Sequence, residues 1–220
     1  MKRLAPCILA VCLPLTLIAF AEQTTAAESK AAEAAEHKPA AKVAAKPAVV
    51  DSLTLLEKAV ARDSSKVDNL FKLGVMYLDR DRPLDAIKVL SKAATKKPND
   101  LKILVNLGAA QDAAGHPDLA QTYYHKALEV APDDSVASCR LASSLYAQGK
   151  HHESVDLLRG LIEKKPNSYC AYFTLGVAFA DAGIYRDAIR MWKKVVELAP
   201  GSPEAVSAQE SIDVLQKLVQ

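Results

Sequence analysis

The residues of this chain best suited to chemistry are its cysteines. Four occur among 220 residues: Cys7 and Cys12 lie in an N-terminal apolar run, whereas Cys139 and Cys170 lie far from it. A pair of cysteines forms a disulfide in an oxidising compartment, and as free thiols the same pair is a candidate thiol or metal site. Which chemistry applies depends on the compartment and on the elements that position the two sulfurs.

The histidines and carboxylates are the other candidates for chemistry. His151 and His152 are adjacent, with His116 upstream, but adjacent side chains of a regular helix point about 100° apart. We therefore expect surface histidines rather than metal ligands. The carboxylates, Asp112 and Asp133 among them, are scattered like helix caps and solvated faces. The sequence holds no convincing nucleophile–base pair, phosphate-binding glycine loop or zinc spacing, so we expect no enzyme, no metal and no cofactor.

The N-terminus has the pattern of a targeting segment. Two basic residues precede an apolar run over 4–20, and small residues stand at Ala19 and Ala21. This pattern predicts a signal peptide over 1–21, cleaved after Ala21, and export to the periplasm. The alternative is an uncleaved inner-membrane anchor, but Pro6 and Pro14 interrupt a run that is already short for the about 20 residues of a membrane span.

Composition separates a linker from a folded domain. Residues 22–50 are rich in Ala, Lys, Glu and Pro and contain no aromatic residue, which predicts a disordered linker. The rest, 51–220, is expected to be one domain. Without Lys2 and Arg3 the basic residues fall from 28 to 26 and equal the 26 acidic ones. A neutral chain without a basic block gives no reason to expect a nucleic-acid partner.

The domain repeats itself every 34 residues. Four prolines mark the interval: Pro98, Pro132, Pro166 and Pro200. Four blocks then align without gaps: 67–100, 101–134, 135–168 and 169–202. A turn column divides each block into two helical halves, and it holds Asp81, Gly115, Gly149 and Gly183. Segments 51–63 and 203–218 are expected to be capping helices, because the outer faces of stacked repeats need cover. Ser202 is the expected N-cap of the second segment, and the residues expected to cover the fourth block are Val206, Ile212, Leu215 and Leu218.

The blocks resemble tetratricopeptide repeats. The first block carries the signature residues of that family, which are Leu70, Leu73, Gly74, Tyr77, Ala86, Leu90 and Pro98. The second block departs from the signature at Gln111, and the third departs from it at Ser138, Ala142 and Ser154. The third block is therefore expected to be the most loosely packed. The resemblance implies an all-α fold, an α-solenoid (right-handed superhelix) of four helix-turn-helix repeats with flanking capping helices.

The resemblance also implies where a partner would bind. In this family the first helix of each pair lines a concave groove that holds a peptide or a helix. The residues in the matching columns are Phe71, Val75, Leu78, Val105, Ala109, Asp112, Ser143, Tyr146, Phe173 and Val177. These columns are mostly apolar, which favours a hydrophobic or amphipathic protein segment over a small-molecule substrate. Internal packing and self-association are the alternative uses of the same stripe.

These features together predict a non-catalytic protein–protein interaction scaffold of the cell envelope, acting in envelope assembly or secretion. A membrane-tethered repeat adaptor is one alternative, and a thiol or metal site at Cys139 and Cys170 is another. Both cysteines fall on first helices of adjacent blocks, on the side of the groove. Neighbouring helix axes lie about 8–10 Å apart, whereas a disulfide needs Cα atoms within about 7 Å. The pair is thus a borderline disulfide candidate, with two free thiols as the alternative.

Overall fold

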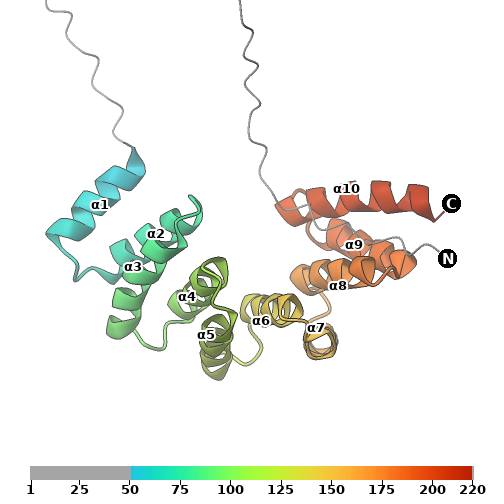
Figure 1. Ribbon diagram of the computed structural model, residues 1–220, viewed down its shortest axis with the longest axis horizontal. Helices are drawn as coiled ribbons and strands as arrows, with labels where there is room; N and C mark the ends of the chain where they lie inside the picture. Colours follow the sequence, from blue (N-terminus) through green and yellow to red (C-terminus); the bar gives the residue numbers. More distant parts are fainter. Residues whose placement is uncertain (1–50, 220) are drawn as a thin grey trace, which may run out of the picture. The chain divides into compact units, whose positions relative to one another are not determined.

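The computed structural model describes residues 51–219, which form ten α-helices and no strand. Figure 1 shows them in chain order: α1 (Ser52–Arg62), α2 (Val67–Leu78), α3 (Pro83–Lys96), α4 (Leu101–Ala113), α5 (Pro117–Val130), α6 (Ser135–Ala147), α7 (His151–Lys164), α8 (Tyr169–Asp181), α9 (Tyr185–Leu198) and α10 (Pro203–Leu218). The segments interpreted as signal peptide and linker lie outside the described residues. Among the helices that are described, none combines the length and apolarity needed to cross a bilayer.

The four 34-residue blocks fold as four helix pairs, α2–α3, α4–α5, α6–α7 and α8–α9. Every helix packs against its neighbours in sequence. The first helices of successive blocks also touch one another, α2 with α4, α4 with α6 and α6 with α8. The predicted all-α solenoid of helix pairs is confirmed, and its stacking places the first helices of adjacent pairs side by side.

The turn inside each pair depends on one residue with left-handed backbone. Gly115 has φ +78°, and the next amide, that of His116, donates to the carbonyl of Gln111 at 2.9 Å. This bond closes the end of the first helix and turns the chain into the second. The same backbone conformation recurs at Gly149, Gly183 and, with a side chain, Asp81.

The small-residue column lets the two helices of a pair approach closely. A methyl group added at Gly108 would lie 2.5 Å from a ring carbon of Tyr124, which is fully buried. The third block has Ala142 in this column, and the buried Ser154 donates its hydroxyl to the carbonyl of Ala142 at 2.7 Å. Ser154, one of the residues that set this block apart in the sequence, is therefore buried and hydrogen-bonded.

The end of the domain is covered by α10, which begins at the predicted cap. Ser202 accepts a hydrogen bond from the amide of Ala205 at 3.0 Å, and Pro203 is the first helical residue. The helix buries Ala205, Ala208 and Ile212 against α9.

The sequence pattern misassigned part of the face that α10 buries. Val206, Ile212, Leu215 and Leu218 are the residues expected to cover the fourth block. That expectation holds for Ile212, and Leu215 packs partly against the same cluster. Val206 and Leu218 are instead 55% and 61% exposed. The face that α10 buries against α9 instead carries two alanines, Ala205 and Ala208.

Candidate functional site

The first helices of the third and fourth blocks enclose a pocket of about 210 Å³. Three residues of α6 and three of α8 line it: Ser143, Tyr146, Ala147, Phe173, Thr174 and Val177. Ser143 lies one helical turn before Tyr146 and Ala147, and Phe173 and Thr174 lie one turn before Val177, so each trio occupies a single helix face. The surface of the pocket is almost entirely apolar.

The pocket joins four of the residues that the sequence placed in the groove, Ser143, Tyr146, Phe173 and Val177. Phe173 and Val177 are half-buried and pack against the core formed by α9 and α10. Ser143 is exposed at the rim. These four side chains therefore form an apolar recess that is supported from behind and open in front.

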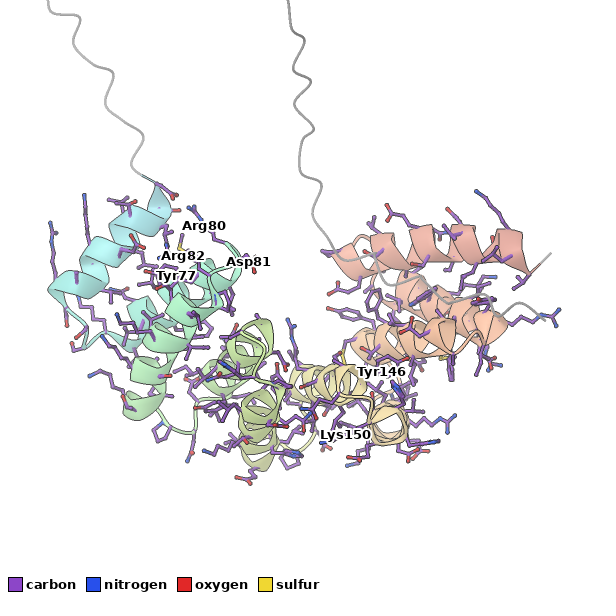
Figure 2. All side chains as sticks on the ribbon, viewed as in Figure 1. Tyr77, Arg80, Asp81, Arg82, Tyr146 and Lys150 are labelled. Carbon is purple, nitrogen blue, oxygen red and sulfur yellow. A yellow bond between two sulfur atoms is a disulfide. The ribbon has the colours of Figure 1, made fainter. Side chains whose placement is uncertain are left out.

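Tyr146 lies near the end of α6 (Figure 2). The ring of His151, at the start of α7, lies 4.4 Å from the tyrosine ring at an angle of 58°. Burial raises the pKa of Tyr146, and the carboxylate of Asp181 on α8 raises it further. The tyrosine thus stays protonated at physiological pH and gives the pocket a neutral wall.

The other predicted groove residues are distributed differently. Val105 is 8% exposed and belongs to a small core formed by α4, α5 and α6. Phe71 and Leu78 pack partly onto the core of the first block. Val75 and Ala109 are half-buried. None of these residues lines the pocket between α6 and α8.

Asp112 is not the solvated acid that its pattern suggested. Its carboxylate accepts hydrogen bonds from the hydroxyl of Tyr124 at 2.8 Å and from that of Ser144 at 2.9 Å. It thereby connects α4, α5 and α6. Burial raises the pKa of Asp112, although both hydrogen bonds act in the opposite direction. The interpretation of this residue as a solvated surface acid is wrong, because its two partners lie on other helices beneath the surface.

We expect Asp112→Asn to gain stability relative to the wild type as pH rises. The pKa of Asp112 is higher folded than unfolded, so the folded state binds the proton more tightly. At pH values above the folded pKa, ionisation of Asp112 therefore destabilises the folded state. Well below the unfolded pKa the carboxyl is protonated in both states, and this penalty is absent. The Asn variant lacks this penalty, and its amide can still pair with both hydroxyls. A relative gain of about 1 kcal/mol between pH 3 and 7 is expected. Urea unfolding at several pH values measures it, and a difference that does not vary with pH would contradict the account.

A second hollow of about 360 Å³ lies among α1, α2 and α3. The hydroxyl of Tyr77 donates to Glu57 at 2.9 Å, and the guanidinium of Arg82 lies 4.4 Å from the centre of the Tyr77 ring (Figure 2). Arg80 also makes two hydrogen bonds with Asp51, at 2.6 and 2.8 Å. These polar groups satisfy one another, so this region is better suited to attaching α1 than to binding a partner.

The cysteines and histidines occupy separate places. Cys139 and Cys170 are bonded through their sulfurs, with Cα atoms 6.1 Å apart, inside the range of about 7 Å that a disulfide requires. Bonded to each other, neither sulfur is a thiolate ligand. Nδ1 of His116 lies 3.0 Å from Oε1 of Gln111, in a different block from His151. Over residues 51–219, no three His, Cys, Asp or Glu side chains are arranged to hold a metal ion.

Comparison with known proteins agrees with this architecture. At 25% identity over 154 residues the chain is similar to Superkiller protein 3 of Saccharomyces cerevisiae, a match covering 64% of this chain and 11% of that protein. At 30% identity over 100 residues it is similar to the peroxisomal targeting signal receptor of Candida albicans, covering 44% of this chain and 17% of that protein. The chain thus spans only a small part of either relative.

Solved structures and family profiles point to the same repeat. The structure of TTC0263, a thermophilic TPR protein of Thermus thermophilus, has a TM-score of 0.63 at 17% identity, covering 73% of this chain and 88% of that chain. YrrB, described as a TPR protein with an unusual peptide-binding site, has a TM-score of 0.52 at 23% identity, covering 72% and 81%. Profiles of the tetratricopeptide repeat match residues 51–100 and 102–207. The chain belongs to the tetratricopeptide repeat family.

Proposed function

We propose that this protein is a non-catalytic interaction scaffold that binds a hydrophobic or amphipathic segment of another protein between α6 and α8. The observation that carries the proposal is the apolar pocket between these helices. Tetratricopeptide repeats are in general protein-interaction modules, and the description of YrrB as a peptide-binding member supports the same use.

The size and lining of the pocket favour a peptide over a small molecule. Its volume of about 210 Å³ is below the about 300–1,000 Å³ typical of small-molecule sites. A single large apolar side chain anchored on Phe173 and Val177 fits such a recess better. An amphipathic helix presents anchors of this kind at intervals of one turn, and its polar face would remain in solvent.

The experiment compares partner recovery by the full-length protein with that by two pocket variants, Ser143→Glu and Phe173→Asp. Either change brings a carboxylate into the apolar recess, so we expect recovery of a bound protein to fall at least about tenfold. Ser143 is exposed, so the first variant should fold normally, as circular dichroism would show. Leu84→Asp is the control, because Leu84 is 69% exposed on α3, away from the pocket. Equal recovery by wild type and Ser143→Glu would reject the pocket.

We further propose that the scaffold works in the cell envelope, in assembly or secretion, after export by the N-terminal segment. The apolar run that ends before Ala21 supports this placement. N-terminal sequencing of the protein from cells is expected to begin at Glu22. An intact N-terminus would instead support the membrane-tethered adaptor.

A further inference from the structure

The disulfide lies on the same helix faces as the pocket. Cys139 is in α6 and Cys170 is in α8, and they are 31 residues apart in sequence. Ser143 follows Cys139 by one turn, and Thr174 and Val177 follow Cys170 by one and two turns. Residues at these intervals share a helix face. The two helix faces that the bond joins therefore continue as the two walls of the pocket.

Noncovalent packing holds α6 and α8 together mainly behind the pocket. Cys139 belongs to a buried cluster that includes Leu158, Ala171 and Leu175. In front of this cluster the two helices are separated by the pocket itself. Behind the pocket the spacing of the two helices is set by this cluster, and beside the pocket the covalent bond one turn away limits it.

We propose that Cys139 and Cys170 form a thiol–disulfide switch that sets the spacing of α6 and α8, so that the bridged protein binds its partner and the reduced protein binds it weakly. This inference rests on the proposed function of the pocket and adds its regulation. It also identifies a modification site for a dithiol reductant or, in the reverse direction, a disulfide oxidant.

A dithiol reductant opens the bridge in two successive exchanges. A thiolate of the dithiol attacks the sulfur of Cys170, which is partly exposed, whereas Cys139 is 7% exposed. The bond between the two protein sulfurs breaks, and Cys139 leaves as a thiolate that takes a proton from water. The second thiol of the reductant then displaces Cys170, which also becomes a thiol. The protein gains two electrons and two protons, and the reductant leaves as a disulfide.

The reduced state keeps the fold but loosens the pocket. A free Cys139 remains in its apolar cluster as a small hydrophobic residue. Trp192, the only tryptophan of the chain, reports on α8 because its indole N–H donates to the carbonyl of Phe173 at 3.2 Å. Phe173 lies on the pocket wall, three residues after Cys170.

The test uses the full-length chain, oxidised with glutathione disulfide or reduced with dithiothreitol, and the dye 8-anilinonaphthalene-1-sulfonate as the pocket probe. Peptide mapping without reductant should find the Cys139–Cys170 bridge after oxidation. On reduction we expect amide exchange in α6 and α8 to rise about tenfold, with α2 unchanged. We expect Ser143→Glu to abolish binding of the dye at the pocket. Reduction of the wild type should weaken this binding at least about threefold, because the pocket walls are no longer held at one spacing. The double variant Cys139→Ser with Cys170→Ser should show the amide exchange and dye binding of the reduced protein, and dithiothreitol should change neither.

The outcomes separate the switch from the binding function. Free thiols after oxidation, or dye binding that is unchanged or tighter on reduction, would overturn the switch. If Ser143→Glu still weakens the dye in that case, the pocket remains a binding site without redox control. Dye binding that does not depend on Ser143 would overturn the pocket, and the switch with it.

Discussion

Replacing Ile212 by Asp is expected to detach α10 from the end of the domain. Ile212 is 2% exposed and packs with Ile189, Trp192 and Val195 of α9. Burial of an unpaired carboxylate in this cluster would cost about 4 kcal/mol or more, among the largest effects of a single substitution. In a stacked repeat each unit is stabilised by its neighbours, so the fourth block loses its cover when α10 leaves.

Two measurements follow the loss of α10. The midpoint of urea unfolding should fall, and the emission of Trp192, which is 5% exposed in the wild type, should shift to the red. Val214→Asp is the matched control on the same helix, because Val214 is 59% exposed. It should change stability by less than about 0.5 kcal/mol. Equal effects of the two substitutions would show that α10 does not cover the fourth block.

The arrangement of helices followed from the sequence because each block repeats the same local instructions. A glycine with left-handed backbone ends the first helix. A small residue of the first helix also faces a large residue of the second, as Gly108 faces Tyr124. These signals act within a few residues or within one pair, where spacing alone is informative. Asp81 carries no such signal by residue type, and its column identified it.

The site was harder to predict because it depends on contacts between blocks. Ala147 and Thr174 line the pocket, yet neither residue type indicates a binding site. Val105 shares a column with Phe173 but is buried among α4, α5 and α6. The bond from Tyr124 to Asp112 stays within the second block, but the bond from Ser144 crosses from the third block to the second. No single repeat therefore contains the whole pattern.

Replacing Gly176 by Ala is expected to destabilise the protein by about 2–3 kcal/mol, the cost of overfilling a well-packed contact. The added carbon would lie 2.3 Å from Nε1 of Trp192. The indole cannot yield easily, because it is 5% exposed and bonded to the carbonyl of Phe173. Instead α8 must move away from α9, and Phe173 and Val177 move with it. The variant should therefore lose partner binding as well as thermal stability.

Gly160→Ala is the matched control, and it should act in the opposite direction. Gly160 lies inside α7, where an added methyl group would have no atom of another helix within 4 Å. Alanine there restricts the unfolded chain and favours the helix, so a gain of about 0.5–1 kcal/mol is expected. Thermal unfolding of both variants separates the two causes. If helix propensity were decisive, both would be stabilised. If close approach of α8 and α9 is decisive, the signs differ, because Gly176 has an aromatic ring where its side chain would be and Gly160 has none.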